Sequence, residues 1–547
     1  MKTRLLLIAL LTFMLNACVP QDPIIVYVTP TAQPTSAASV ATVINPTIAA
    51  ASATPTETAT VSPVESTPII VTPDAPTVPM VPTQPPTVAA VVTFTPAASP
   101  QVIGPLIGPG YVPPTLPPAP ETSAPTSAPP PVTDAAATPV EATAVAVAPE
   151  ATQPPQQGTF APLPNLDPNL VGIQLDINLS QEDWNEAMGR IENLGVKWIK
   201  VQLPWRDMQP NGPDERGTEF FRRIEQHLED AARRGFSVMV SVVKAPAWAR
   251  SNQTEDGPPD DPNALARFIT IIFEEFNAGL QRPTIGDYID AVEIWNEPNL
   301  IREWQGTLPF TGAGYMRLFE PAYRAVRAYS PDITVIVAGL APTGNSEGSV
   351  DDTEFLRQMY AAGLGNFRDI VIGAHPYGWG NAPDSRCCGE RGWDDNPHFF
   401  YLETLDAYRE IMNANGHQDV QMWITEFGYA SWDGYPLEPP QPWMAFNSRW
   451  QQGGYTVRAI QIAQERGDIG VKVLWNLNFA VLSGLITGRD ERAAYSMLVP
   501  GGGCAVDVNN QGSTERPVYW MLYDAFRHDV QLQDWCGIPP NPIPGFE

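Results

Sequence analysis

The strongest constraint on the fold is a regular alternation of apolar runs and helical patterns in the last two thirds of the chain. Apolar runs of strand length recur eight times, and a segment with helical periodicity follows each of them. Near-continuous apolar strands are typical of parallel sheets that helices cover on both faces. The predicted strands are residues 170–177, 196–203, 237–243, 291–295, 333–340, 369–375, 420–427 and 471–477.

Eight such β/α units predict an α/β fold, a closed (β/α)8 TIM barrel with enlarged loops. A doubly wound open sheet is the competing fold, but it needs a glycine-rich phosphate turn after its first strand. The stretch "GIQLDINLSQED" has no such turn. In the helix that follows, Ser180 is a predicted N-cap and Gly195 a predicted C-cap.

The beginning of the chain predicts an export signal. Lys2 and Arg4 precede an apolar stretch from Leu5 to Leu15 that is too short to span a bilayer. The residues up to Cys18 resemble a bacterial lipobox, which implies a signal peptide over residues 1–18, lipid attachment at Cys18 and a membrane-anchored protein at the bacterial cell surface. An ordinary secretory signal with an incidental cysteine, and thus a secreted protein, is the alternative.

Residues 19–164 form a predicted linker. The segment is rich in Pro, Thr, Ser and Ala and contains no Lys, Arg or Trp. Such a composition cannot bury a core, so we expect a disordered, semi-stiff tether ahead of a catalytic domain at residues 165–547. Trp first appears at Trp184, inside that domain.

Charge and cysteine content narrow the class of protein further. The formal net charge is −28 and no basic cluster follows a predicted element, which argues against a nucleic-acid partner. After Cys18 four cysteines remain, and an exported chain favours disulfides, at Cys387 or Cys388 or between Cys504 and Cys536. A zinc site is the alternative, although the vicinal pair lacks the usual spacing of a zinc knuckle.

Two glutamates carry the predicted chemistry. In a barrel of this kind the active site lies at the carboxyl ends of the strands. Glu297 in "EIWNEPN" follows the fourth strand, and Glu426 in "WITEFGYAS" ends the seventh. Two carboxylates that flank a glycosidic bond can protonate the leaving oxygen and attack the anomeric carbon. A structural ion pair is the alternative role for each.

Both motifs resemble those of the retaining glycoside hydrolases of clan A, especially families 39 and 5, which include cellulases and xylosidases. The resemblance covers about residues 168–530. It implies that Glu297 is the acid/base, that Glu426 is the nucleophile and that Asn296 binds the sugar 2-hydroxyl. The substrate would be a plant or microbial poly- or oligosaccharide, and the implied enzyme is a monomer without cofactor or metal.

The same resemblance assigns His375 and Tyr377 to the site, with Tyr377 donating a hydrogen bond to the nucleophile, and makes Trp475 a stacking platform for sugar. A phenol beside a carboxylate favours the ionised form, and an indole face packs on the C–H face of a pyranose. His375 could instead be a core histidine. Trp205 and Trp248 are predicted to lie at the mouth of the barrel and to bind substrate.

Some residues depart from the family 5 pattern. Near strands two and three, where arginine and histidine are frequent, the chain has Lys200 and Lys244. Glu293 is interpreted as structural. Two rival functions stay open: a carbohydrate-binding module that has lost catalysis, and a metal-dependent hydrolase, which the scarcity of histidines at strand ends disfavours.

Overall fold

The computed structural model describes residues 162–252, 256–275, 283–389, 391, 394–488, 490–502, 504–507, 509, 512–527 and 535–547. The predicted signal peptide with Cys18, and residues 19–161 of the predicted linker, lie outside these ranges. Within them, none of the helices combines the length and the apolar character that crossing a bilayer requires.

Eight parallel strands close into a barrel, as predicted. Each strand pairs with the next along the chain, and β8 pairs with β1. The strands are β1 (Val171–Gln174), β2 (Trp198–Pro204), β3 (Ser237–Val243), β4 (Ala291–Ile294), β5 (Thr334–Val337), β6 (Ile370–Ala374), β7 (Met422–Phe427) and β8 (Ile469–Trp475).

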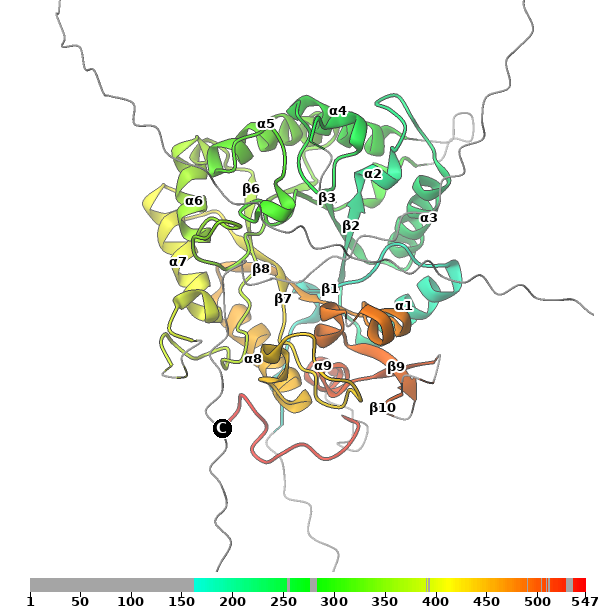
Figure 1. Ribbon diagram of the computed structural model, residues 1–547, viewed down its shortest axis with the longest axis vertical. Coiled ribbons are helices and arrows are strands. Elements are labelled where there is room, and N and C mark those ends of the chain that lie inside the picture. Colours follow the sequence, from blue (N-terminus) through cyan, green and yellow to red (C-terminus); the bar gives the residue numbers. More distant parts are fainter. Residues whose placement is uncertain are drawn as a thin grey trace, which may run out of the picture. The chain divides into compact units, whose positions relative to one another are not determined.

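Helices surround the barrel in the order of the sequence (Figure 1). Their apolar faces pack on the strands, and the barrel interior is buried along its whole length. The helices are α1 (Gln181–Leu194), α2 (Trp205–Met208), α3 (Glu219–Arg233), α4 (Pro262–Glu274), α5 (Gly312–Tyr329), α6 (Asp352–Ala361), α7 (Tyr401–Ala414), α8 (Arg449–Arg466) and α9 (Pro517–Arg527).

Helix α1 has the capping residues that the sequence predicts. The Ser180 hydroxyl accepts a hydrogen bond from the backbone N–H of Asp183, and Gly195 ends the helix in the left-handed conformation with φ of 82°. A residue with a Cβ atom would be strained at that φ. The helix therefore has fixed ends, and its apolar face is buried against the barrel.

The segment after β8 adds a three-stranded antiparallel sheet that was not predicted. Its strands are β9 (Leu498–Gly502), β10 (Ala505–Val506) and β11 (Ser513–Glu515), in the order β10–β9–β11. The run of glycines in β9 is typical of a loop, and these strands are too short to show periodicity. A disulfide between Cys504 and Cys536 confirms one of the predicted bridges, and Cys387 pairs with its neighbour Cys388.

Strained backbone gathers at the carboxyl ends of the strands. Four residues other than glycine have positive φ there: Lys244 (62°) after β3, Trp295 (75°) and Glu297 (40°) after β4, and Trp379 (54°) after β6. Such conformations cost free energy and tend to persist at functional sites. This end of the barrel is also where the predicted catalytic residues lie.

Candidate active site

The two predicted catalytic glutamates meet at the mouth of the barrel. Glu426 is the penultimate residue of β7, and Glu297 lies in the turn after β4, where its backbone N–H donates to the carbonyl oxygen of Gly339 at 3.0 Å. Both side chains are buried, and a carboxylate oxygen of one lies within 4.8 Å of an oxygen of the other. The structure thus brings together two carboxylates that are 129 positions apart in the sequence (426 − 297).

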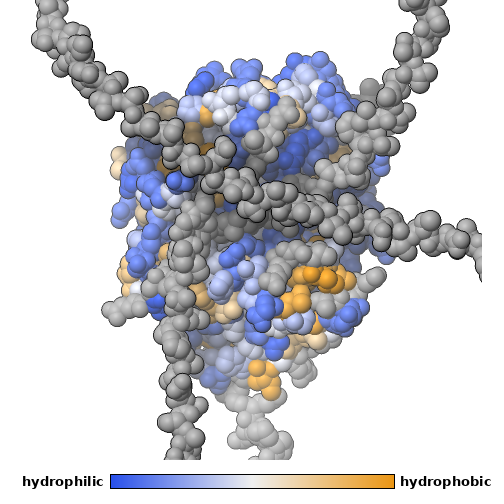
Figure 2. Space-filling view, viewed as in Figure 1, coloured by the Kyte–Doolittle hydropathy of each residue, from blue (hydrophilic) through white to orange (hydrophobic). Residues whose placement is uncertain are grey.

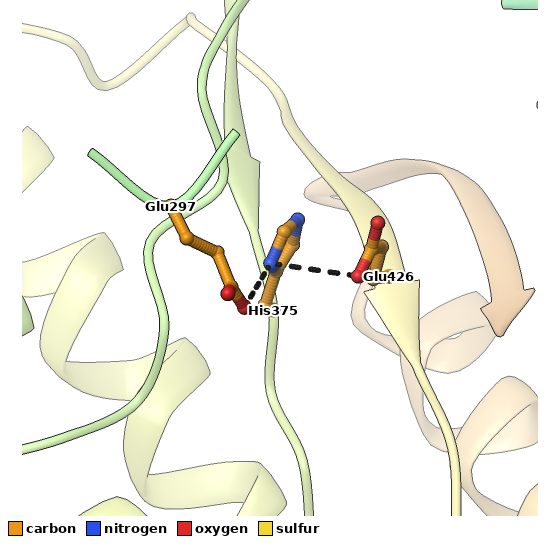
Figure 3. Close-up of side chains that lie close together, drawn as sticks. All are labelled: Glu297, His375 and Glu426. Carbon is orange, nitrogen blue, oxygen red and sulfur yellow. Dashed lines mark hydrogen bonds and ion pairs between the residues drawn. The ribbon is translucent and has the colours of Figure 1, made fainter. Parts of the chain in front are cut away.

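His375 lies between the two carboxylates (Figure 3). It follows β6, and its Nδ1 is 3.1 Å from Glu297 Oε1 and 4.0 Å from Glu426 Oε2, while its Nε2 is 3.1 Å from Thr425 Oγ1. Burial alone would lower the pKa of His375, but the neighbouring carboxylates of Glu426, Glu293 and Glu297 raise it to about 9. At neutral pH this imidazole is therefore a cation that donates to Glu297.

Glu297 has a second cationic partner in Arg302. The guanidinium lies in a short 3-10 helix, η4 (Ile301–Glu303), and donates to Glu297 Oε2 at 2.9 Å. Burial alone would raise the pKa of Glu297, but the hydrogen bond from His375 and the charge of Arg302 lower it. In the free protein at neutral pH, Glu297 is a carboxylate held at both oxygens.

Glu303, next along η4, behaves in the opposite way. Burial raises its pKa to about 7, against the attraction of Arg302 and Lys244. Its carboxylate lies 3.6 Å from the same arginine that binds Glu297. Arg302 is therefore shared between a carboxylate that is ionised throughout the neutral range and one that titrates within it.

Lys200 of β2 holds the side chain of Glu426 in place. Its ammonium group donates to Glu426 Oε1 at 3.1 Å and to the Thr425 carbonyl oxygen at 3.1 Å, and it lies 2.9 Å from Glu293 Oε2. Burial alone would lower the pKa of Lys200, but Glu293 and Glu426 raise it. All three donors of the ammonium group are used, so this lysine fixes the position of Glu426.

Charge is balanced across this buried network. Burial alone would raise the pKa of Glu293, but Lys200 and His375 bring it well below its usual range, so it is ionised. Three carboxylates thus face three cations, and each buried charge has a partner of opposite sign. The members are Glu293, Glu297, Glu426, Lys200, His375 and Arg302.

The aromatic residues predicted for the site lie around Glu426. The Tyr377 hydroxyl donates to Glu426 Oε2 at 3.3 Å, which is the predicted contact. Burial raises the pKa of Tyr377 well above its usual value, with Glu426 adding to the effect, so the phenol keeps its proton. Trp475, the last residue of β8, contacts Tyr377 edge-on with ring centroids 6.4 Å apart. Asn296 is 6% exposed, and its Oδ1 has no hydrogen-bond partner among the described residues.

Two predicted substrate-binding residues do not join this group. Trp205 is fully buried at the start of α2, where its ring stacks on Phe268 of α4 at 5.0 Å. Trp248 packs edge-on against Trp205 and donates its indole N–H to the Gln209 carbonyl oxygen at 2.8 Å. Trp205 is therefore a core residue between two helices, a position that does not fit the predicted role in stacking on sugar.

Among the residues that the structure describes, two groups of side chains could offer ligands to a metal ion. Glu297, His375 and Glu426 each present one ligand atom within 4.8 Å of the others, and so do Asp351, Asp352 and His398 beside α6. In the first group, the proton on His375 Nδ1 already bridges to Glu297, so a metal ion would have to displace it.

The comparison with protein families settles the class of protein. The model described as "Cellulase (glycosyl hydrolase family 5)" matches residues 163–479, more than half of the chain. The chain belongs to glycosyl hydrolase family 5. Of the two families that the motifs suggest, family 5 is therefore the one shown, and the protein is a glycoside hydrolase. No curated protein matches the sequence.

Solved structures that resemble this family 5 hydrolase include a family 39 glycoside hydrolase from Bacteroides cellulosilyticus WH2, with 17% identity, a TM-score of 0.46 and coverage of 66% of this chain and 65% of that one. The endo-β-1,4-glucanase from Xanthomonas axonopodis pv. citri has 13% identity, a TM-score of 0.41 and coverage of 66% and 100%. A β-glucosidase from Exiguobacterium marinum has 13% identity, a TM-score of 0.43 and coverage of 66% and 99%.

Sequence reasoning missed the partners of the two glutamates in this family 5 hydrolase. Lys200 was noted only as a departure, Glu293 was interpreted as structural, and Arg302 was not considered. A signal existed for Glu293, because it is the one charged residue inside an otherwise apolar predicted strand, whereas the strand of Lys200 also contains Lys197 and Gln202. Arg302 lies in a loop and leaves no such signal.

Proposed function

We propose that this family 5 hydrolase cleaves β-linked glucan chains by double displacement and retains the anomeric configuration. One observation supports the mechanism above all: carboxylate oxygens of Glu297 and Glu426 lie within 4.8 Å of each other. In retaining glycosidases the carboxyl groups are roughly 5 to 5.5 Å apart, whereas inverting enzymes leave about 6.5 to 9.5 Å for a water molecule. The glucan substrate rests on the description of the family as cellulase.

Glu426 is the nucleophile in this proposal. Lys200 and Tyr377 donate to its two oxygens and hold them in place at the end of β7. Its attack on the anomeric carbon forms a glycosyl ester and breaks the bond to the leaving oxygen. Trp475 supplies a flat apolar wall for the pyranose, and the unsatisfied amide of Asn296 is free to bind the 2-hydroxyl.

Glu297 is the acid/base, and His375 supplies its proton. At neutral pH the proton lies on His375 Nδ1, 3.1 Å from Glu297 Oε1. Moving the proton along this hydrogen bond gives a neutral imidazole and a carboxylic acid without changing the net charge of the pair. Glu297 then protonates the leaving oxygen, and as a carboxylate it accepts a proton from the water that hydrolyses the ester.

A panel of aryl glycosides and polysaccharides tests the function. We expect turnover of aryl β-glucosides and of a soluble β-glucan, and NMR of the first-formed product should show the β-anomer. An α-anomer as first product would exclude double displacement. Binding of glucan without turnover under any condition would favour a carbohydrate-binding module, and loss of activity on chelation would favour the metal-dependent alternative.

We further propose that the protein is exported and anchored through a lipid at Cys18, with residues 19–164 as a tether. The lipobox-like end of the signal segment and the Pro/Thr-rich composition support this location. In cells, Cys18→Ala should move the hydrolase from the membrane fraction to the soluble fraction while its specific activity on a soluble substrate stays the same. Retention of that variant in the membrane fraction would contradict the anchor.

A further inference from the structure

Arg302 forms a contact that opposes the proposed role of Glu297. Its guanidinium donates to Glu297 Oε2 at 2.9 Å, while His375 Nδ1 lies 3.1 Å from Oε1. Figure 3 shows the Glu297 side chain directed at His375. A general acid must turn a protonated oxygen toward the leaving oxygen, whereas a cation bound to a carboxyl group favours the ionised form. In the free protein Glu297 is therefore held as a carboxylate and is not ready to act as an acid.

Of the two cations on Glu297, His375 is fixed in place. The residue is fully buried, and its Nε2 lies 3.1 Å from Thr425 Oγ1. A Cβ atom on Gly339 would lie 2.2 Å from that same nitrogen, so the imidazole ring is closely packed on this side. His375 therefore stays at Glu297 Oε1, which is where the proposed mechanism needs its proton.

Arg302 lies at the edge of the cluster, on a backbone that is itself anchored. The indole N–H of Trp295 donates to the carbonyl oxygen of Glu303 at 2.9 Å, which ties the end of η4 to the turn after β4. The Arg302 side chain is 20% exposed, against 4% for Glu297 and 0% for His375. Long side chains that reach solvent change rotamer readily. Arg302 is thus the cation that can leave Glu297 without movement of the backbone.

Glu303 offers the guanidinium a second acceptor. Arg302 Nε lies 3.6 Å from Glu303 Oε1. Burial raises the pKa of Glu303 to about 7 against the charges of Arg302 and Lys244, while the charges of Glu297 and Asp256 add to the rise. A closer ion pair with Arg302 would offset the cost of keeping this buried carboxylate ionised. The guanidinium can therefore leave Glu297 and still be paired.

The charge of Arg302 also acts on Glu491, in the 3-10 helix η9 (Glu491–Tyr495) after β8. Burial raises the pKa of Glu491, and the hydrogen bond from Gln441 and the charge of Arg302 oppose the rise. Arg302 thus lies among several carboxylates, and a shift within this group costs less than removal of the guanidinium from all of them.

We infer that Arg302 is a positioning residue, which holds Glu297 in the free enzyme and moves to Glu303 when the leaving group enters. The inference rests on the proposed function and adds a step to it, because release of Glu297 precedes cleavage. Once Arg302 has moved, the carboxyl group of Glu297 can turn, take the proton from His375 and deliver it to the leaving oxygen. The departing group then carries that proton, and Glu297 is again a carboxylate.

Two aryl β-glucosides that differ in the leaving group test the inference. An activated dinitrophenyl group departs without protonation, whereas a phenyl group needs it. We expect Arg302→Met to raise the ratio of kcat/KM for the phenyl glucoside to kcat/KM for the dinitrophenyl glucoside by about 3- to 10-fold, because Glu297 no longer has to be released. A lower ratio would mean that Arg302 assists departure, and an unchanged ratio that it only supports the fold; both would overturn the inference.

Two further variants at arginine positions control for loss of charge. Arg302→Lys keeps a cation but not the planar fork, so its ratio should lie between those of the wild type and Arg302→Met. Arg317→Met is the matched control, because Arg317 is exposed on α5 in a groove with Arg324 and Phe367. Figure 2 shows mainly hydrophilic surface where Figure 1 labels α4 and α5. Arg317→Met should leave the ratio at the wild-type value.

Glu303→Gln should change the ratio in the opposite direction, because the guanidinium loses the acceptor to which it moves. Asp419→Asn, in an exposed turn before β7 at the other end of the barrel, is its matched control and should change nothing. In the Arg302→Met background Glu303→Gln should have little further effect on the ratio. An equal effect of Glu303→Gln with and without Arg302 would overturn the transfer of the guanidinium to Glu303.

NMR of the isotope-labelled carboxyl group of Glu297, assigned by its loss in Glu297→Gln, separates this inference from the proposed function. Burial raises the pKa of Glu297, while the hydrogen bond from His375 and the charge of Arg302 lower it. Arg302→Met should therefore raise this pKa and move the basic limb of kcat/KM to higher pH. Turnover of the glucosides without a rise in the pKa would overturn the inference and uphold the hydrolase. A rise in a protein that turns over neither glucoside would uphold the contact and refute the proposed function.

Discussion

Two clusters in this molecule have nearly the same chemical composition. At the mouth of the barrel His375 lies between Glu297 and Glu426, and beside α6 His398 lies between Asp351 and Asp352. In both, burial alone would lower the pKa of the histidine but neighbouring carboxylates raise it, to about 9 for His375 and about 10 for His398. A cluster of a histidine and two carboxylates is therefore not by itself evidence of catalysis.

The clusters differ in where they lie in the fold. Both carboxylates of the α6 cluster are used within the fold: Asp351 accepts the Glu354 backbone N–H as the N-cap of α6, and Asp352 accepts the Tyr408 hydroxyl at 2.9 Å. His398 pairs with them at 3.0 and 2.7 Å. The members of the mouth cluster, in contrast, lie at or just after the carboxyl ends of β4, β6 and β7, where a barrel of this kind has its active site. The place in the fold, more than the charges, distinguishes the candidate catalytic cluster from a structural ion pair.

The largest expected effect is on Glu426. If the mouth cluster is catalytic, Glu426→Ala removes the nucleophile and should lower kcat by roughly 10⁵- to 10⁶-fold on every substrate, as expected for loss of a residue that forms the covalent intermediate. Steady-state kinetics on aryl glucosides measure this, with circular dichroism to show that the variant is folded. A folded variant with more than a tenth of wild-type activity would contradict a catalytic role for the mouth cluster, and the two clusters would then not differ in function.

Glu297→Ala should have a smaller and selective effect. Loss of general acid catalysis should cost on the order of 10²- to 10⁴-fold, most for poor leaving groups. An activated aryl glucoside should still form the glycosyl ester, and azide should then accelerate turnover and give a β-glycosyl azide. Equal losses in Glu297→Ala and Glu426→Ala on all substrates, with no effect of azide, would contradict the assignment of the two roles.

The sequence allowed prediction of the barrel and of the positions of both glutamates, because strand periodicity and the ends of strands follow from local patterns. Glu297 and Glu426 are recognisable since each lies directly at the end of an apolar run. Gln174 lies in the first predicted strand, yet its register with Lys200 and Trp475 on the two neighbouring strands is set by the pairing of the sheet, which no local pattern encodes.

Aromatic residues show most clearly what cannot be predicted from the sequence alone. Trp205 follows a predicted strand and Trp475 lies near the end of one, and from the sequence both are candidates for sugar stacking. In the structure Trp205 begins α2 and turns into the core against Phe268, whereas Trp475 ends β8 beside Tyr377. The direction of the chain after a strand decides between packing and substrate contact, and that direction is set by the loop as a whole.

We expect the α6 cluster to stabilise the fold and to have no part in catalysis. The folded pKa of His398, about 10, lies above its unfolded value of 6.5, so the ion pair stabilises the fold fully below pH 6.5 and the contribution is lost as pH rises through 10. Urea unfolding should show His398→Gln to be less stable than the wild type by roughly 2 to 4 kcal/mol at pH 6.5. The deficit should shrink toward pH 10, while kcat of the folded variant stays at the wild-type value. A large loss of kcat would mean that the two clusters are not functionally distinct.

The smallest predicted effect concerns Glu303 and the pH profile of the mouth cluster. Glu303 titrates near pH 7 beside Arg302 and Lys244, and Glu297 and Asp256 are the acidic groups that act on it. Above pH 7 Glu303 carries a negative charge, which stabilises the proton that His375 and Glu297 share. The pair must keep this proton in order to protonate the leaving oxygen. Glu303→Gln removes that charge, so the basic limb of kcat/KM should move to lower pH by a few tenths of a unit to about one unit.

The acidic limb and the Tm should change little, and Asp419→Asn, which is remote from the site, should leave both limbs in place. A shift of the basic limb to higher pH would contradict this role and would show that Glu303 acts mainly by holding Arg302 against Glu297, because loss of Glu303 would then let the guanidinium move away from Glu297.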